Sequence, residues 1–505
     1  MRKRLLYNTL TSLLLQLVTV ICGFILPKYI LLYFGSEVNG LVSSITRFLS
    51  LITFLEMGVG AVIQSSLYEP LAKKNQLEIS EIIVSGGAFF KKIAQALLVY
   101  VIILVIFFPI ISNTSSQFDW FFTATLIVSI SISSFAQYYF GIIDRLLLAA
   151  DQKGYIQYGT QIITLLVNLL ISVALVKAGY SIQSVKLVSS LLFLIKPLVI
   201  RVYVNKQYNI NRKLKLTREP IKQKWNGIAQ HIAAIILSDT DTVVLTIFST
   251  MANVSIYSVY FMIVNGITCL IEALASGMQS IVGDLWARKE YGKLNNFFEI
   301  IELFIHSITT LFFSCMLILI IPFVKVYTIG ISDVNYNQPL FAVLLVAAYG
   351  VYCLRMPYIM VIFAGSHYKQ TQKCFIVAAI LNILISMISV SKWGLVGVAI
   401  GTLVAMVYQT GWMALYDSKN LIKRSFKNFV RQCCIDIVST ILTIFVTSLI
   451  RINVATYFDW VGMAILFFII ASIITFGTNF IFNKCKMKNL FMFIFKRTTV
   501  FYKKY

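Results

Sequence analysis

Charged residues are scarce in this sequence, and acidic residues are scarcer than basic ones. Only 12% of the 505 residues are charged, with 43 Lys and Arg against 20 Asp and Glu. Soluble domains use about 25% charged residues. This shortage excludes a soluble enzyme with an ordinary hydrated surface.

Sequence patterns of enzyme active sites are also lacking. There is no Walker lysine loop, no Ser/His/Asp set, no HExxH helix and no glycine fingerprint. The eight cysteines show no metal-ligand spacing and lie mostly in apolar runs, where cysteine packs as a small apolar residue. We therefore expect no enzymatic activity, no metal and no bound cofactor.

What the chain has in abundance is hydrophobic sequence. Apolar residues make up 59% of the chain, and the mean hydropathy is +0.84. Apolar runs of about 20 residues predict membrane helices. The first run follows Met1-Arg-Lys-Arg without a small-residue cleavage site, so we interpret it as a retained helix. The sequence predicts an all-α integral membrane protein with about fourteen transmembrane helices, over residues 5–33, 39–68, 83–111, 118–149, 155–177, 181–204, 224–249, 253–283, 294–328, 336–364, 370–390, 393–416, 430–450 and 458–482.

The chain contains an internal repeat at an offset of 214 residues. Asn168-Leu-Leu-Ile-Ser172 returns as Asn382-Ile-Leu-Ile-Ser386, and the same offset places Asn39 on Asn253 and Ser44 on Ser258. Repeated halves of membrane helices are typical of transporters that bind substrate between the halves. We predict a six-helix lobe over 1–205, a basic cytoplasmic linker over 206–222, a second six-helix lobe over 223–417, and two extra helices with a basic cytoplasmic tail over 418–505.

Basic residues indicate the orientation. With the N-terminus in the cytoplasm, the predicted outer side keeps only Lys177, Lys186, Lys325, Lys392 and Arg451, while the basic tail places the C-terminus in the cytoplasm as well. The net charge of +23 then reflects topology and attraction to membrane lipids. Nucleic-acid binding is the competing explanation of such a charge. We expect no nucleic-acid partner, because the basic residues are scattered over several loops.

Four basic residues lie within the predicted membrane segments. A charge at mid-membrane costs about 2.5–3.5 kcal/mol, so such residues usually face a cavity or a partner. Three of the four stand beside a proline, which bends a helix and frees carbonyl groups. We predict that they bind an anionic substrate; the alternative for the first two is that they reach the outer interface. The four are Lys28, Arg47, Lys196 and Arg355.

Four acidic residues lie in the predicted membrane segments as well, and they are candidates for coupling to H⁺ or Na⁺. They are Glu56, Asp239, Asp241 and Glu272. A structural ion pair with a basic neighbour is the alternative, and Lys28 facing Asp241 is one such expected pair. Glu302 and His306, four residues apart, could form a proton relay or an interfacial hydrogen bond.

Four sequence motifs carry a resemblance to a known family. They are Leu55-Glu-Met-Gly-Val-Gly60, Asp241-Thr-Val-Val-Leu245, Ile256-Tyr-Ser-Val-Tyr260 and Gly283-Asp-Leu-Trp-Ala-Arg-Lys-Glu290. With the arrangement of six, six and two helices, the whole chain resembles the Wzx-type polysaccharide-transport flippases. These belong to the multidrug/oligosaccharidyl-lipid/polysaccharide exporter superfamily.

The resemblance implies a flippase of the bacterial inner membrane. Its substrate would be an undecaprenyl-diphosphate-linked oligosaccharide, the repeat unit of O-antigen lipopolysaccharide, capsule or another surface polysaccharide. Alternating access would carry it to the outer leaflet, with H⁺ or Na⁺ coupling and with a polymerase and glycosyltransferases of the same pathway as partners. Two alternatives remain open: a multidrug or toxin cation antiporter of the same fold, and an integral-membrane glycan polymerase or ligase. The short predicted outer loops count against the latter.

Overall fold

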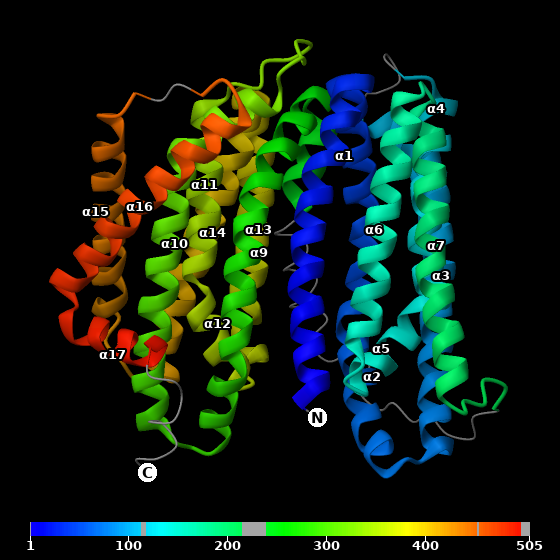
Figure 1. Ribbon diagram of the computed structural model, residues 1–505, viewed down its shortest axis with the longest axis horizontal. Helices are drawn as coiled ribbons and strands as arrows, with labels where there is room; N and C mark the ends of the chain where they lie inside the picture. The colour runs from blue at the N-terminus through cyan, green and yellow to red at the C-terminus, as the bar shows by residue number, and fades with distance from the viewer. Residues whose placement is uncertain (1, 113–117, 215–238, 452–453, 496–505) are drawn as a thin grey trace. The chain divides into compact units, whose positions relative to one another are not determined.

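The computed structural model describes residues 2–112, 118–214, 239–451 and 454–495, and the regular secondary structure of these residues is helical throughout (Figure 1). Twelve of the described helical segments are long and apolar enough to cross a membrane. The chain is therefore a multi-pass membrane protein, which confirms the predicted all-α membrane fold. Of the helix predicted at 224–249, residues 224–238 lie outside the described residues, as do residues 215–222 of the predicted linker and 496–505 of the predicted tail.

The chain divides into two compact units. The first comprises Met1–Ser258 with Ile331–Val334, and the second comprises Val259–Gly330 with Asn335–Tyr505. The lobe boundaries that the repeat predicts remain a prediction.

The described elements of the first unit are α1 (Arg2–Ser50), η1 (Leu51–Thr53), α2 (Phe54–Lys73), α3 (Gln76–Ile111), α4 (Trp120–Ala136), η3 (Gln137–Gly141), α5 (Ile142–Ala150), α6 (Gly154–Lys177), α7 (Ile182–Gln207) and the helical residues 239–248. Helix α9 (Met251–Ala287) begins in the first unit and continues into the second. The second unit also contains α10 (Tyr291–Tyr327), α11 (Pro339–Leu354), α12 (Met356–Ala364), α13 (Tyr368–Trp393), α14 (Leu395–Asn420), α15 (Lys427–Ser448), α16 (Tyr457–Phe482) and α17 (Lys484–Phe495).

Helix α1 is two helical segments that meet at Gly35, where φ is 81°. Glycine suits this position because a positive φ is unfavourable for residues with a side chain. Asp333 then caps the segment that follows, since its carboxylate accepts the Ser36 amide at 2.6 Å and the Ser36 hydroxyl at 2.8 Å. A carboxylate is favourable at the N-terminus of a helix. The helices predicted over 5–33 and 39–68 are thus joined at a kink, without the loop that the hydropathy pattern suggests.

The predicted helix 39–68 is interrupted in its middle. A 3₁₀ turn, η1, separates the end of α1 from α2. The Ser50 hydroxyl donates to the Arg47 carbonyl and the Thr53 hydroxyl donates to the Ser50 carbonyl, both at 2.7 Å. Hydroxyl side chains that bond the preceding turn compete with the helical ladder and often bend it. The apolar pattern contains no information about these side-chain hydrogen bonds. The prediction of one continuous helix over 39–68 was therefore wrong.

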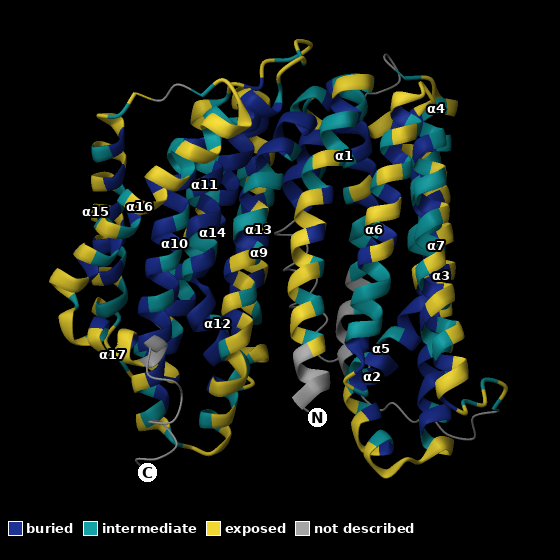
Figure 2. Cartoon of the chain, in the orientation of Figure 1, coloured by how far each residue is buried: buried dark blue, intermediate teal, exposed yellow. Residues whose placement is uncertain are grey.

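Several helices carry exposed residues along one face (Figure 2). Many of these exposed residues are large and apolar. On α1, Leu14 and Leu17 are 50% and 62% exposed, and on α15 the exposed fraction of Phe445 is 62%. Soluble proteins rarely expose contiguous apolar surfaces of this kind. The pattern fits helices whose outer faces contact lipid.

Helices α13 and α14 pack at backbone contact over the second copy of the repeated sequence. A Cβ atom on Gly401 would lie 2.2 Å from the Ser386 hydroxyl oxygen, and one on Gly397 would lie 2.4 Å from the Ser389 carbonyl oxygen. Asn382 donates across the same interface to the Thr402 hydroxyl at 3.1 Å. Small residues that allow close approach, with polar contacts between them, are typical of membrane helix interfaces. The spacing of Gly397 and Gly401, four residues apart in an apolar run, predicts such close packing from the sequence, and the structure confirms it.

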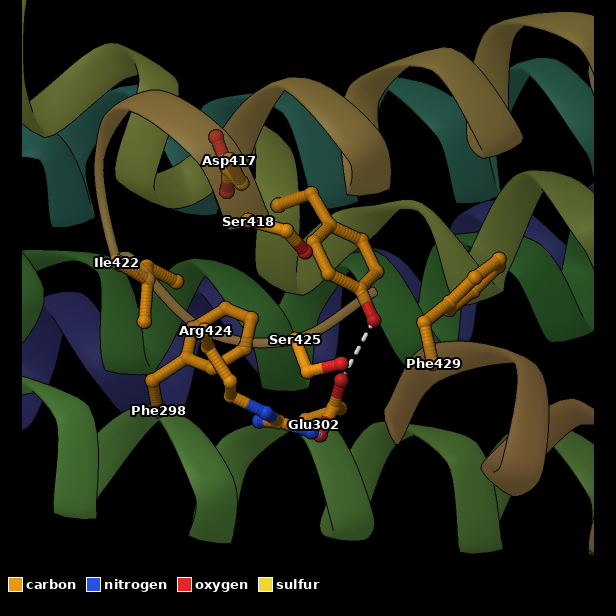
Figure 3. Close-up of a pocket in the computed structure, with 9 residues that line it drawn as sticks. Phe298, Glu302, Asp417, Ser418, Ile422, Arg424, Ser425 and Phe429 are labelled. Carbon is orange, nitrogen blue, oxygen red and sulfur yellow. Dashed lines mark hydrogen bonds and ion pairs between the residues drawn. The ribbon is translucent and has the colours of Figure 1, made fainter. Parts of the chain in front are cut away.

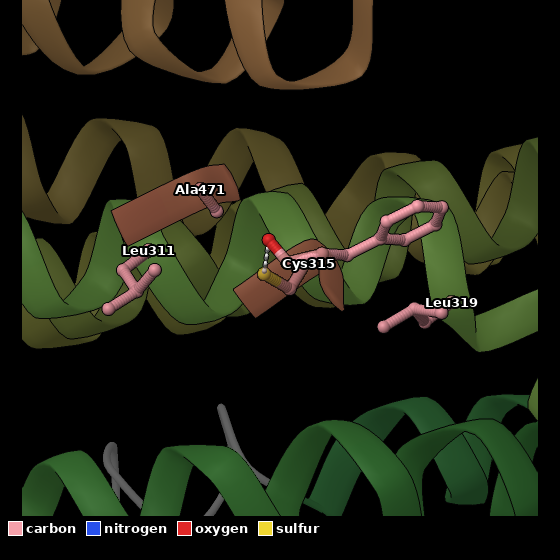
Figure 4. Packing of buried hydrophobic residues seen from close by; sticks show 5 residues of the cluster. Leu311, Cys315, Leu319 and Ala471 are labelled. Carbon is pink, nitrogen blue, oxygen red and sulfur yellow. Dashed lines mark hydrogen bonds between the residues drawn. The ribbon is translucent and has the colours of Figure 1, made fainter. Parts of the chain in front are cut away.

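The extra C-terminal helices pack on α10 of the second unit. Leu311, Cys315 and Leu319 of α10 form a buried cluster with Phe467 and Ala471 of α16 (Figure 4). The basic tail begins as α17, whose Met487 and Leu490 pack on Ile300 and Leu303 of α10. Met487 and Leu490 are therefore buried. The charge of the tail alone does not indicate this burial.

Candidate functional site

The first unit contains a partly open cavity of about 230 Å³ that is lined by both polar and apolar groups. Residues of α4, η3, α5, α6 and α7 line it, and most of them present hydroxyl, amide or cationic groups. The lining residues are Ser133, Ser134, Gln137, Gly141, Ile142, Arg145, Gln161, Phe193, Lys196, Pro197 and Ile200.

Irregular backbone shapes this cavity. The helix predicted over 118–149 is divided by a π-helical turn, η3, between α4 and α5. Single π turns inside helices are rare and occur frequently at functional sites. Gly141 closes the turn against α7, because a Cβ atom there would lie 2.9 Å from the Cβ of Pro197. Pro197 lies inside α7 and cannot donate a helical hydrogen bond.

Two cations from different helices face this cavity, and they differ in how they are compensated. Arg145 of α5 donates to the Glu56 carboxylate of α2 at 2.6 Å. Lys196 of α7 donates to the neutral side-chain carbonyl of Gln161 at 2.9 Å. Within the described part of the chain, no carboxylate oxygen lies within 4 Å of the Lys196 ammonium. With Glu56 paired to Arg145, the cavity keeps one positive charge in excess.

The size and charge of the cavity limit what it can hold. A cavity of about 10–15 Å³ holds one water molecule, so a volume of about 230 Å³ accommodates a small anion with several waters. Sites for drug-sized ligands begin near about 300 Å³. The cavity therefore suits a phosphate or diphosphate group, and it is too small for a complete oligosaccharide head group.

Arg47 and Asp239, two of the sequence-predicted site residues, form an ion pair. The Arg47 guanidinium donates to the Asp239 carboxylate at 2.7 Å, and Ser50 donates to the other carboxylate oxygen at 3.0 Å. Asp239 is buried, whereas a third of the Arg47 side chain is exposed. These contacts hold the second segment of α1 to the helical residues 239–248, helped by Ser44 and Thr246 at 2.6 Å.

The remaining predicted residues of the first unit lie in different surroundings. Asp241 is 1% exposed and accepts the Tyr257 hydroxyl at 2.9 Å. Lys28 follows Pro27 inside the first segment of α1 and is half-buried. Glu56 was predicted as a coupling carboxylate, and the structure places it on Arg145.

In the second unit, Arg355 is buried at a break between helices. The helix predicted over 336–364 divides there into α11 and α12, one residue ahead of the Met356-Pro357 step. The Arg355 guanidinium lies over the Tyr352 ring at 4.4 Å from its centroid, and one nitrogen lies 3.9 Å from the Met406 sulfur. Tyr352 in turn donates to Glu272 at 2.6 Å, where Glu272 is exposed. Among the described residues, Arg355 has no carboxylate within 4 Å.

Sequence reasoning missed several functional-site candidates at the ends of helices. Arg145 lies in the helix predicted over 118–149, but it was not among the residues predicted to bind substrate. Arg424 and Asp436 were not among the predicted site residues either. Arg424 donates to Glu302 at 2.6 Å, and Asp436 lies 2.5 Å from His306, which is fully buried. The helical spacing of Glu302 and His306 identified these two residues from the sequence, but it could not identify their partners Arg424 and Asp436.

The fold is shared with solved membrane transporters. No protein-family model and no curated protein matches the sequence. The structure of "Lipid II flippase MurJ, inward closed conformation" is similar with a TM-score of 0.72 and 16% sequence identity, covering 94% of this chain and 98% of that one.

An inward-facing multidrug resistance MATE family transporter of the MOP superfamily is similar with a TM-score of 0.56 and 13% identity, over 80% of this chain and 95% of that one. The Vibrio cholerae MATE transporter VcmN in its bent form is similar with a TM-score of 0.53 and 14% sequence identity, covering 82% of this chain and 94% of that one. At these identities the comparisons establish the fold that this chain shares with the superfamily.

Proposed function

We propose that this protein is a flippase of the bacterial inner membrane, with both termini in the cytoplasm. It moves an undecaprenyl-diphosphate-linked oligosaccharide from the inner to the outer leaflet by alternating access. An ion gradient drives the cycle. The observation that carries the proposal is the cavity of the first unit, where Lys196 has no carboxylate partner among the described residues.

The charge of this cavity favours an anionic substrate. The diphosphate is the charged part of a lipid-linked glycan, and charge-assisted hydrogen bonds from Lys and Arg are the strong ones. A cation such as a drug would be repelled by the excess positive charge that Lys196 contributes. The multidrug resistance transporter that shares this fold is therefore the less favoured model for this chain's substrate.

The size of the cavity in the first unit supports contact with the diphosphate but not with the rest of the substrate. A cavity of about 230 Å³ has no room for several sugar rings. In the proposed cycle the glycan and the polyprenyl tail stay outside this cavity, and only the phosphate groups reach Arg145 and Lys196. In this proposal the size of the glycan is not limited by the size of the cavity.

The proposal is tested by reconstituting the full chain in vesicles with a fluorescent undecaprenyl-diphosphate oligosaccharide and measuring its accessibility in each leaflet. We expect Lys196→Ala to slow translocation about tenfold or more, because a charge-assisted hydrogen bond is worth about 1.5–3 kcal/mol. Lys206→Ala is the matched control, since Lys206 lies in the last turn of the same helix and is exposed.

Two results would contradict the proposal. Equal translocation by wild type, Lys196→Ala and Lys206→Ala would show that the cavity does not bind the diphosphate. Efflux of a cationic dye by vesicles that leave the lipid-linked glycan in place would identify an antiporter.

A further inference from the structure

The second unit contains a small polar pocket that the proposed substrate path does not use. It has a volume of about 10 Å³ and lies where α10, α12 and the end of α14 meet the chain segment leading to α15 (Figure 3). The lining residues are Phe298, Glu302, Tyr358, Asp417, Ser418, Ile422, Arg424, Ser425 and Phe429.

Asp417 is the unusual member of this pocket. It is 1% exposed, and neither oxygen of its carboxylate has a hydrogen-bond partner among the described residues. The neighbouring Ser418 hydroxyl donates to the Ala414 carbonyl at 2.7 Å. A buried carboxylate that is ionised and unpartnered is strongly unfavourable, so such a group neutralises itself or acquires a cation.

The other charged groups of the pocket are paired with one another. Glu302 accepts from Arg424 at 2.6 Å and from the Tyr358 hydroxyl at 2.6 Å. The second terminal nitrogen of Arg424 is buried without a partner among the described residues. Two carboxylates and one guanidinium therefore line this pocket, and one negative charge is in excess if Asp417 is ionised.

We propose that Asp417 is a proton-binding site, which is protonated in this conformation and releases its proton when Arg424 turns to it. The Arg424 guanidinium lines the same pocket, and its positive charge disfavours a metal cation beside Asp417, whereas a proton neutralises the carboxylate directly. The ionised carboxylate would then bind the free nitrogen of Arg424. The ionised carboxylate of Asp417 thus competes with the carboxylate of Glu302 for the Arg424 guanidinium.

The groups around Asp417 can be named from each neighbouring element. Glu302 faces the pocket from α10, Tyr358 from α12, and Arg424 from the segment before α15. One turn beyond Glu302, His306 is held by Asp436 of α15 at 2.5 Å. On its own helix, Asp417 follows Tyr416, whose hydroxyl contacts His367 at 2.7 Å.

Proton binding at Asp417 deepens the proposed function, and its role as the coupling site rests on that function. Binding and release of one proton would bias Arg424 between two carboxylates that belong to different helices. Because α10 and α14 both belong to the second unit, such an exchange could alter the packing of these helices during the cycle. The gradient would then act on a residue that is distant along the chain from those that line the cationic cavity of the first unit.

Infrared difference spectroscopy of the full chain in lipid nanodiscs tests the proposal directly. We expect wild type at neutral pH to show the carbonyl stretch of a protonated carboxyl group, and we expect Asp417→Asn to lack it. Asn has the shape of the protonated form, so this variant should fold. Glu69→Gln is the matched control, because Glu69 is exposed and paired with Lys73. A band that is absent in wild type, or unchanged in Asp417→Asn, would overturn the assignment.

A second measurement separates a proton from sodium. Thermal unfolding in NaCl and in KCl at equal ionic strength should give the same Tm for wild type. Stabilisation by sodium that disappears in Asp417→Asn would overturn the proton assignment in favour of a metal ion.

Vesicle transport then distinguishes this proposal from the proposed function. We expect Asp417→Asn to translocate the glycan without acceleration by a proton gradient. If the infrared band is lost in Asp417→Asn while wild type moves no glycan, the proton site stands and the flippase function fails. If acceleration by the gradient persists in Asp417→Asn, Asp417 is not the coupling site.

Discussion

The Arg47 guanidinium donates to the Asp239 carboxylate at 2.7 Å. The sequence indicated opposite roles for the two residues, substrate binding for the cation and ion coupling for the acid. Their contact means that each compensates the charge of the other in this conformation. A role for either in transport then requires that the pair open during the cycle.

A double-mutant cycle measures what this pair contributes. We expect Arg47→Ala and Asp239→Ala to be coupled by about 1 kcal/mol in the free energy of unfolding, because Arg47 is partly exposed and solvent screens the attraction. Unfolding in detergent gives the four free energies. Strict additivity of the two substitutions would contradict an energetic pair. If Arg47 also binds substrate, the variant with both substitutions should be more stable than the sum of the two single effects predicts, and it should still translocate substrate slowly.

Substitution at the α13–α14 interface should distinguish close packing from helix propensity. We expect Gly401→Ala to destabilise the protein by about 1–3 kcal/mol, because overpacking forces neighbouring atoms apart. The new Cβ would lie 2.2 Å from the Ser386 hydroxyl oxygen. Gly411→Ala on the same helix is the control, since a Cβ there meets nothing within 4 Å. It should be neutral or stabilising by up to about 1 kcal/mol, as alanine favours helix. Equal Tm values for both variants would rule out close packing as the function of Gly401.

The surroundings of Arg355 predict an order of effects at Tyr352. Tyr352→Phe keeps the ring under the guanidinium and loses a hydrogen bond to the exposed Glu272, so it should cost at most about 1 kcal/mol. Tyr352→Leu removes the ring, and a desolvated cation–π contact is worth about 2 kcal/mol. Thermal unfolding compares the two variants. If Phe costs as much as Leu, the hydroxyl bond to Glu272 rather than the ring stabilises Arg355.

Substitutions on the two sides of the cationic cavity should change anion binding in opposite directions. Glu56→Gln removes the carboxylate that pairs with Arg145 and raises the positive charge of the cavity by one. We expect affinity for inorganic diphosphate, measured by calorimetry on the purified protein, to rise several-fold in Glu56→Gln and to fall in Lys196→Gln. Opposite signs follow only if both residues act on one site. A fall in both variants would show that Glu56 is needed to form the cavity.

The acidic residues that the sequence emphasised do not include Asp417, whose carboxylate has no hydrogen-bond partner among the described residues. Glu56 and Asp239 form ion pairs, and Asp241 accepts a tyrosine hydroxyl. Asp417 stands near the end of an apolar run, where a hydropathy profile assigns a carboxylate to water. Its burial depends on the segment of residues 421–426 and on α15, which return over the end of α14. No local pattern contains that information.

The sequence by itself determined that this protein crosses the membrane many times as helices and that glycines bring α13 and α14 together. These properties follow from local composition, because twenty apolar residues must satisfy their backbone hydrogen bonds within a helix when lipid surrounds them. Only the tertiary structure decided where helices break, as at Gly35 and Arg355, and which charges meet. An ion pair such as Arg47 with Asp239 joins residues almost two hundred positions apart. Its energy depends on distance and burial, and neither can be obtained from the order of residues along the chain.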